Sequence, residues 1–396
     1  MREVVVLGVG VHPWGKFDEK SVLQMTLETA NKAVEDAGVE WRDIGGIGAA
    51  SSHFSGGMGW GLSANELTQA VAMNGVPVFN VSAACAAGGS AFNAAYLMVA
   101  NGVCDIALVI AGEKMPKGFI PRTPGAAEDI TDIDYLRWSA IGLPNPGYWA
   151  MEARRRMHDF GTTEAHFAKV SVKAHKVGAQ NPYARYHKVF TLEEVLNSNM
   201  VNYPLRLYEI CAVSDGAAAI ILGSSEEGRK RTTKPVSVAA STIATGKFGD
   251  PQIRIPEIST TAKPTAPYYS EATIAVKRAY EMAGIGPEDI SFAEIQDNCS
   301  WQELAWPELF ELCQPGESDW MVDHDETGVD GKLPINPSGG FLSFGEATTA
   351  MGIWQVYEIV EQLRGQAGAR QVKNAKVGIG ATLGLGANGS AIILKV

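Results

Sequence analysis

The sequence lacks any apolar stretch that approaches the roughly 20 residues a membrane-spanning helix requires. It also lacks a basic tract of five or more residues, and the net charge is −11 at pH 7. An acidic chain without basic clusters excludes a general role in nucleic-acid binding. The first residues lead directly into a β-rich segment (VVVLGVGV, 4–11) without the pattern of a signal peptide. We therefore expect a cytoplasmic protein.

Cysteine is also scarce: the chain has five, and none of them belongs to a C-x-x-C pair. An odd number of cysteines in a reducing compartment predicts free thiols, without disulfides and without a structural zinc site. The hydrophobic content of 46% excludes global disorder. At 396 residues the chain exceeds the size at which a single core stops growing, so we expect two domains or a duplicated fold.

One segment of the sequence is repeated. AVEDAGVEWRDI (33–44) returns as AYEMAGIGPEDI (279–290), at a constant offset of 246 residues. Each copy has the pattern of an amphipathic helix that ends at a glycine and leads into a turn and a strand. An α/β unit repeated at this distance is not a solenoid repeat. It predicts two similar halves, at 1–232 and 233–396, with mixed sheets covered by helices on both faces.

The segment 115–200 within the first half is polar, aromatic and rich in proline, and it contains a helix-like run at 148–159. Segments inserted on a rigid scaffold commonly carry specificity. We interpret this one as a substrate-binding insertion. The three arginines at 154–156 are interpreted as a solvated helix face, with a contact to a phosphate-bearing ligand as the alternative.

Cys85 is the candidate nucleophile. It lies in a run of small residues (NVSAACAAGGSAF, 80–92) that opens a helix extending to about Asn101. A thiol at a helix N-terminus faces unpaired N–H groups and the positive end of the helix dipole, which predicts a pKa below the ~8.5 of free cysteine. The small neighbours allow close approach by a substrate or by another helix. The alternative is an inert, tightly packed cysteine.

Four further segments complete a pattern: DIALVIAGEKM (105–115), PLRLYEICAVSDGAAA (204–219), NPSGG (336–340) and GLGANG (384–389). Together with the run around Cys85 they resemble the thiolase superfamily, in its sterol-carrier-type and lipid-transfer-type branch, over essentially the whole chain. The resemblance implies an α/β thiolase fold, in which two pseudo-symmetric halves form a five-layer αβαβα arrangement. It also implies that Cys85 is catalytic.

One motif of this branch is altered. Where its members carry His-Asp-Cys-Phe, the chain has Gln296, Asp297, Asn298 and Cys299. The Gln296 amide can hold a water or a thioester oxygen. Asn298 stands at the position of the second cysteine and cannot transfer a proton. Cys299 is one residue further along, where strand alternation would turn it to the other face, and it stays one candidate for the acid and base.

Glu346, in GEATTAMG (345–352), stands where the family pattern has the histidine that activates the nucleophile. A carboxylate can accept the Cys85 proton. It can donate to an oxyanion only when protonated, and burial beside an apolar wall would raise its pKa enough for that role. The alternative is a solvated or salt-bridged glutamate in a site that has lost thiolase chemistry.

The resemblance implies an acyl-CoA C-acyltransferase that cleaves a β-ketoacyl-CoA with CoA as co-substrate, through an acyl-cysteine and without a tightly bound cofactor. Backbone N–H groups of Cys85 and of the loop containing Gly386 would hold the thioester oxyanion. Asn298 and His53, which lies in a loop, are candidates for substrate binding. Nine tryptophans and the aromatic insertion favour a bulky substrate such as benzoylsuccinyl-CoA.

Two other functions remain open. One is retro-aldol cleavage of a β-hydroxyacyl-CoA, which lipid-transfer-type relatives perform with tyrosines in place of the usual histidines, and in which Cys85 would have no role. The other is a non-catalytic scaffold that binds acyl-CoA. The family also implies a homodimer and a small partner subunit with a zinc ribbon and an OB-fold.

Overall fold

The computed structural model describes residues 1–51, 63–71, 75–115, 145–231, 235–247, 260, 270–384 and 388–396. Their largest element is a nine-stranded sheet in the order β3-β2-β4-β7-β1-β8-β11-β10-β9. Its strands are β1 (Val4–Val11), β2 (Ile47–Ala50), β3 (Val78–Val81), β4 (Ile106–Lys114), β7 (Asp215–Ser224), β8 (Val236–Ala244), β9 (Phe292–Ile295), β10 (Val377–Leu383) and β11 (Gly389–Lys395). The short strands β5 (Met200–Asn202) and β6 (Leu205–Arg206) form a separate pair.

The sheet is symmetric about its central antiparallel pair, β1 and β8. On either side of this pair the strand order and the direction of each pairing repeat. β1 and β8 pair antiparallel with β7 and β11, these pair antiparallel with β4 and β10, and those pair parallel with β2 and β9. The duplication read from the sequence is therefore present in the sheet topology.

The repeated segments form equivalent elements. α1 (Val22–Ala37) and α10 (Glu271–Ala283) each begin at a serine cap and end at a glycine. These glycines, Gly38 and Gly284, have φ of 62° and 66°, a left-handed conformation that glycine adopts without steric cost. A 3₁₀ turn and then a strand, β2 or β9, follow each helix. The helix–turn–strand prediction is confirmed for both copies.

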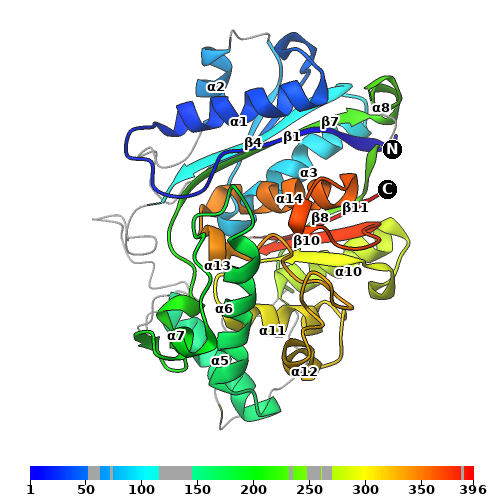
Figure 1. Ribbon diagram of the computed structural model, residues 1–396. Helices are drawn as coiled ribbons and strands as arrows, with labels where there is room; N and C mark the ends of the chain where they lie inside the picture. Colours follow the sequence, from blue (N-terminus) through cyan, green and yellow to red (C-terminus); the bar gives the residue numbers. More distant parts are fainter. Residues whose placement is uncertain are drawn as a thin grey trace, which may run out of the picture.

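Five layers stack through the molecule (Figure 1). α1 packs on the first half of the sheet and α10 on the second half, on opposite outer sides. α3 (Ala87–Ala100) and α14 (Met351–Arg364) lie between the two halves and contact strands of both. Both central helices are buried along most of their length. This confirms the predicted αβαβα arrangement and the predicted helix after Cys85.

Glycines allow the two central helices to cross closely. A Cβ on Gly88 would lie 2.8 Å from the carbonyl oxygen of Thr349, and a Cβ on Gly352 would lie 2.6 Å from the amide nitrogen of Gly89. The glycines after Cys85 therefore serve contact with another helix, one of the two uses that the sequence left open. The crossing brings the N-terminal ends of α3 and α14 together.

The described part of the predicted insertion, 145–200, is more regular than its composition suggests. It forms α5 (Asn145–Phe160), α6 (Glu164–Gly178) and α7 (Leu192–Leu196). α5 and α6 bury apolar faces against α11 (Ser300–Leu309), and α6 also contacts α12 (Glu317–Asp323). The remaining helices are α2 (Ala64–Ala70), α8 (Ser225–Arg231) and α13 (Gly340–Phe344). None of the helices in the described ranges is long and apolar enough to cross a membrane.

Candidate active site

Cys85 lies where the chain turns from β3 into α3. The turn is a 3₁₀ segment, η2 (Ala84–Ala86), in which Ala84 has φ of 48°. An L-residue rarely adopts this left-handed conformation, and it persists only where the surroundings determine it. A Cβ on Gly384 would overlap the carbonyl oxygen of Ala83. Gly384 therefore lies directly against the turn that carries Cys85.

Glu346 lies between α13 and the 3₁₀ turn η5 (Thr348–Ala350) that opens α14. Backbone hydrogen bonds on both sides fix its position: the Glu346 N–H donates to the Ala212 carbonyl at 2.6 Å, and the Ser214 N–H donates to the Glu346 carbonyl at 2.8 Å. The side chain is 3% exposed. Because α3 and α14 cross at their N-terminal ends, Glu346 faces the turn that carries Cys85.

The Cys85 thiol donates a hydrogen bond to Oε1 of Glu346, with 3.5 Å between the sulfur and the oxygen. The hydroxyl of Thr348 donates to the same oxygen, also at 3.5 Å. A nucleophile and a base within hydrogen-bond reach are the arrangement by which enzymes activate a weak nucleophile. The structure thus brings together the two residues that the sequence singled out as nucleophile and base.

The expected lowering of the Cys85 pKa is wrong. Burial raises the pKa of this thiol well above its ordinary value, and the charge and hydrogen bond of Glu346 and the charge of Glu113 raise it further. The effect of a helix N-terminus is small beside desolvation and an adjacent negative charge. Cys85 therefore rests as a thiol, and its proton has to be removed as the sulfur attacks.

Cys211 is a neighbour of this pair that the sequence analysis did not single out. Its buried thiol donates to Oε2 of Glu346 at 3.9 Å, and the amide Nδ2 of Asn298 donates to the Cys211 sulfur at 3.6 Å. Burial raises the pKa of Glu346, while hydrogen bonds from Cys85, Asn298, Thr348 and Cys211 lower it. Glu346 is therefore a buried carboxyl group whose two oxygens both receive hydrogen bonds.

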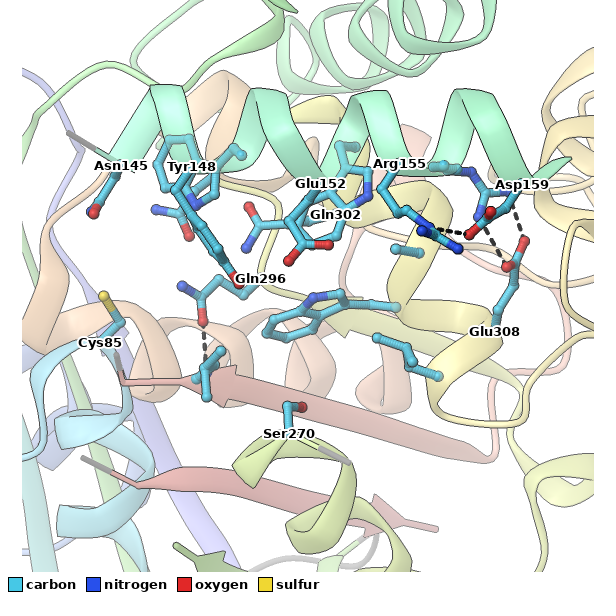
Figure 2. A pocket seen from close by; sticks show the side chains of 18 of the residues that line it. Cys85, Asn145, Tyr148, Glu152, Arg155, Asp159, Ser270, Gln296, Gln302 and Glu308 are labelled. Carbon is cyan, nitrogen blue, oxygen red and sulfur yellow. Dashed lines mark hydrogen bonds and ion pairs between the residues drawn. The ribbon is translucent and has the colours of Figure 1, made fainter. Parts of the chain in front are cut away.

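Gln296 presents an amide donor to the pocket. Its Oε1 accepts a hydrogen bond from the backbone N–H of Leu383 at 2.7 Å. Because that partner can only donate, the oxygen of the amide is assigned and Nε2 is the other atom. In Figure 2 the amide nitrogen lies on the Cys85 side of the Gln296 side chain. An N–H₂ group in this position suits a developing oxyanion or a thioester oxygen.

Asn298 and Cys299 have different surroundings although they are adjacent. Asn298 lines the pocket, and its buried Oδ1 has no hydrogen-bond partner among the described residues. Cys299 is the N-cap of α11 and packs, fully buried, with Leu304 and Leu342. Burial raises the pKa of Cys299. Cys299 follows Asn298 directly, and its side chain points into the core instead of the pocket. The structure therefore does not bring this thiol to the reacting groups.

Cys85, Gln296, Asn298 and Glu346 share one pocket, with a volume of about 310 Å³. From Cys85 the pocket continues along α5. Side chains of α5 form one wall, and side chains of α11 together with Gln296 and Ser270 form the opposite wall (Figure 2). Its walls are largely aromatic and apolar, and the aromatic members are Tyr148, Trp149, Phe160, Trp301 and Trp306. The described part of the insertion thus supplies one wall of the pocket, as a substrate-binding segment would.

The end of the pocket far from Cys85 is charged. Arg156 is 4% exposed and forms a bidentate pair with Glu308, at 2.8 and 2.9 Å, and a further bond with Asp319 at 2.8 Å. The interpretation of 154–156 as a solvated face is therefore wrong for Arg156, while Arg154 is exposed. Residues two apart on a helix point about 200° apart, so Arg154 points away from α11 and α12, which Arg156 faces. Arg155 is not solvated either, because it lines the pocket and pairs with Asp159 at 2.6 Å.

Two predicted site residues, His53 and Gly386, lie outside the described residues. Their roles in substrate binding and in the oxyanion hole stay predictions. Among the residues that the structure describes, no group of three or more His, Cys, Asp or Glu side chains could hold a metal ion.

Two family models match the chain. One is described as the thiolase N-terminal domain and covers residues 4–226; the other is described as thiolase C-terminal domain-like and covers residues 256–395. Between them, these models cover most of the chain, including strands on both sides of the central β1–β8 pair.

Several known proteins are similar over almost the whole chain. The acetyl-CoA acetyltransferase of Methanothermobacter thermautotrophicus is 35% identical over 99% of both chains. Sterol carrier protein 2 of Oryctolagus cuniculus is 31% identical over 99% of this chain and 71% of its own. The benzoylsuccinyl-CoA thiolase subunit BbsB of Thauera aromatica is 30% identical over 94% of this chain and 92% of its own.

A solved structure has the same fold. The Ltp2–ChsH2(DUF35) aldolase superposes with a TM-score of 0.83 at 24% identity, covering 100% of this chain and 98% of that chain.

Proposed function

This chain belongs to the thiolase family, and we propose that it transfers an acyl group from a β-ketoacyl-CoA to CoA through a thioester on Cys85. The observation that carries the proposal is the 3.5 Å approach of the Cys85 thiol to the Glu346 carboxylate at a pocket that the apolar walls of α5 and α11 enclose. A scaffold that only binds acyl-CoA would not need a nucleophile and a base in contact.

In the first half-reaction, Glu346 accepts the thiol proton as the Cys85 sulfur attacks the ketone carbon. The resulting alkoxide collapses, the bond between C2 and C3 breaks, and an acyl-cysteine remains. The departing fragment is the enolate of a shorter acyl-CoA, and protonated Glu346 returns the proton to its C2 atom. One carboxyl group thus serves as base and then as acid.

In the second half-reaction, CoA gives its thiol proton to Glu346 and its sulfur attacks the acyl carbon. The Cys85 sulfur leaves as a thiolate and takes the proton back, which restores the starting thiol and carboxylate. Because the first product, the shorter acyl-CoA, leaves before CoA reacts, the mechanism predicts ping-pong kinetics.

The oxyanions of both half-reactions need hydrogen-bond donors. The Gln296 amide nitrogen is presented toward Cys85 and is proposed to bind one of them. The backbone N–H of Cys85 and the loop containing Gly386 are proposed to bind the other. CoA enters as a co-substrate, and no tightly bound cofactor takes part in these steps.

The substrate is proposed to carry a bulky, aromatic acyl group, with benzoylsuccinyl-CoA as the specific candidate. The aromatic lining between α5 and α11 supports a planar acyl group, and so does the similarity to the subunit BbsB. Trp301→Ala is expected to lower kcat/KM about 10-fold or more for an aromatic β-ketoacyl-CoA, and less for acetoacetyl-CoA. Equal losses for both substrates would contradict an aromatic acyl site.

Intact-protein mass spectrometry tests the covalent step. The wild type and Cys85→Ala are mixed with aromatic and aliphatic β-ketoacyl-CoA thioesters, benzoylsuccinyl-CoA included, without free CoA. We expect an acyl mass on the wild type that is absent from Cys85→Ala and that free CoA removes. Cys313→Ala, which changes a buried cysteine between α11 and α12 that does not line the pocket, serves as the matched control and should keep the adduct.

Retro-aldol cleavage of a β-hydroxyacyl-CoA is the second candidate, and the fold match to the Ltp2–ChsH2(DUF35) aldolase is the observation that favours it. It requires no covalent intermediate. Cleavage of a β-hydroxyacyl-CoA that survives Cys85→Ala, with no acyl adduct on the wild type, would establish it in place of the thiolase reaction.

Two assemblies are proposed with the function: a homodimer, and a complex with a small zinc-ribbon and OB-fold subunit. The family implies the homodimer. Support for the partner subunit comes from the similarity to a protein named as a thiolase subunit and from the fold match to an aldolase that contains ChsH2(DUF35). Light scattering of the isolated chain tests whether it forms a homodimer. The adduct experiment, run with and without a partner subunit, tests whether acylation of Cys85 requires that subunit.

A further inference from the structure

Cys211 is fixed between the two loops that carry the pocket's polar groups. Its backbone N–H donates to the carbonyl of Asn298 at 2.8 Å, and the next residue, Ala212, accepts from the Glu346 N–H at 2.6 Å. The segment at 211–214 is therefore tied to both loops by main-chain hydrogen bonds. These bonds fix the backbone that carries the Cys211 side chain beside Glu346.

The side-chain contacts have a direction. The Asn298 amide donates to the Cys211 sulfur, and the Cys211 S–H donates to Oε2 of Glu346. The thiol is 3% exposed and is not among the groups lining the Cys85 pocket. It borders a second, largely apolar cavity next to Leu342 instead. Cys211 thus contacts two residues of the Cys85 pocket, Glu346 and Asn298, without lining that pocket itself.

Building on the proposed function, we infer that Cys211 is a positioning residue, whose S–H occupies Oε2 of Glu346 so that Oε1 alone exchanges the proton with Cys85. A carboxylate has two oxygens of equal basicity unless a donor distinguishes them. Because Oε2 accepts the hydrogen bond from Cys211, the proton taken from Cys85 stays on Oε1, the oxygen that faces the substrate.

The same contact favours the ionised form of Glu346. The groups that face this carboxyl are the thiols of Cys85 and Cys211, the Asn298 amide and the Thr348 hydroxyl. A hydrogen bond to the charged form of an acid lowers its pKa, here against the raising effect of burial.

Beyond these neighbours lie two further carboxylates. The charge of Glu113 acts on Cys85 and the charge of Asp297 acts on Cys211. Removal of the Cys211 donor should therefore raise the pKa of Glu346 in a site that already disfavours negative charge.

The first experiment compares Cys211→Ala and Cys211→Ser with the wild type in the pH dependence of kcat/KM. Loss of one hydrogen bond to a charged group is expected to move the acidic limb up by about one pH unit in Cys211→Ala. The serine variant retains a donor and should return the limb to the wild-type position or below. Cys313→Ala, a buried cysteine that hydrogen-bonds Ser318 instead, should leave the limb unchanged.

Infrared spectroscopy provides a readout that does not depend on turnover. The carboxyl band of Glu346, assigned by its loss in Glu346→Gln, is titrated in the wild type and in each Cys211 variant. In addition, the S–H stretch of Cys211, assigned by its loss in Cys211→Ser, should move to higher frequency in Glu346→Gln, because the carboxylate acceptor is gone. This second comparison does not require the alanine variant to fold.

The outcomes separate the inference from the proposed function. An unchanged carboxyl titration in Cys211→Ala, or an S–H band that does not respond to Glu346→Gln, would overturn the role of Cys211 even if the wild type forms an acyl adduct. If the wild type forms no adduct, the proposed function fails, and the infrared shifts still decide whether Cys211 holds Glu346.

Discussion

Cys85 and Glu346 lie 261 positions apart in the sequence and 3.5 Å apart between Sγ and Oε1. A thiolate beside the carboxylate would place two negative charges together in a buried site. The pair therefore carries at most one negative charge at rest, and Cys85 is not the group that holds it, whereas a cysteine paired with histidine can rest as an ion pair. Nucleophile activation in this protein has to accompany attack on the substrate.

Glu346→Gln is expected to change catalysis and thiol reactivity in opposite directions. Loss of the base should lower kcat/KM about 10²- to 10⁴-fold. Loss of the negative charge should lower the pKa of Cys85, because that charge raises it in the wild type. Alkylation of Cys85 by iodoacetamide near neutral pH should therefore be faster in the variant. Slower alkylation together with reduced turnover would show that Glu346 does not oppose the thiolate.

Gly352→Ala is expected to destabilise the protein by about 1–3 kcal/mol, because the new methyl group would press against Gly89 where α3 and α14 cross. Urea unfolding measures the loss. Gly246→Ala is the matched control, since a Cβ there meets its nearest atom at an ordinary 3.4 Å. An unchanged stability in Gly352→Ala would mean that the helices can separate without cost.

Glu209 gives the stability a pH dependence. The side chain is fully buried in the turn after β6, and burial raises its pKa to about 7. Since the folded state then binds this proton more tightly than the unfolded state, stability falls as pH rises through the interval from the unfolded pKa to about 7. Relative to Glu209→Gln, the wild type should lose about 2.5 kcal/mol of unfolding free energy between pH 5 and pH 8.

Urea unfolding across that range checks the prediction for Glu209. The variant Glu35→Gln, which changes an exposed glutamate of α1, should run parallel to the wild type. A constant difference between the wild type and Glu209→Gln would show that the buried carboxyl keeps the same charge in both states.

Arg156→Met is expected to destabilise the protein by about 3–5 kcal/mol, because it leaves the buried carboxylates of Glu308 and Asp319 without their cation. Arg154→Met, an exposed position on the same helix, should change the stability by less than about 1 kcal/mol. Thermal and urea unfolding compare the two variants. Similar losses would indicate an effect on α5 itself rather than on the ion pair.

Much of the fold was predictable because short-range sequence patterns specify it and because these patterns occur in two copies. The repeated helix, its glycine cap and the strand that follows are short-range patterns, and each copy formed the predicted elements. The altered motifs also located Gln296 and Glu346, since each stands in a recognisable stretch of sequence.

The less predictable features depend on contacts between distant segments. Arg156 looked like a solvated residue because the acidic partners that bury it lie on α11 and α12. Cys211 stood in one segment of the family pattern (204–219) without a predicted role. Main-chain hydrogen bonds to the loops at 298 and 346 fix its backbone beside Glu346.

The sequence by itself determined the duplicated α/β architecture and placed a cysteine at the start of a central helix, because helix periodicity, capping and small-residue packing act over a few residues. Only the tertiary structure decided the electrostatic state of that cysteine. Desolvation and the charge of Glu346 depend on which segments pack together, and they outweigh the local helix dipole that the sequence reveals.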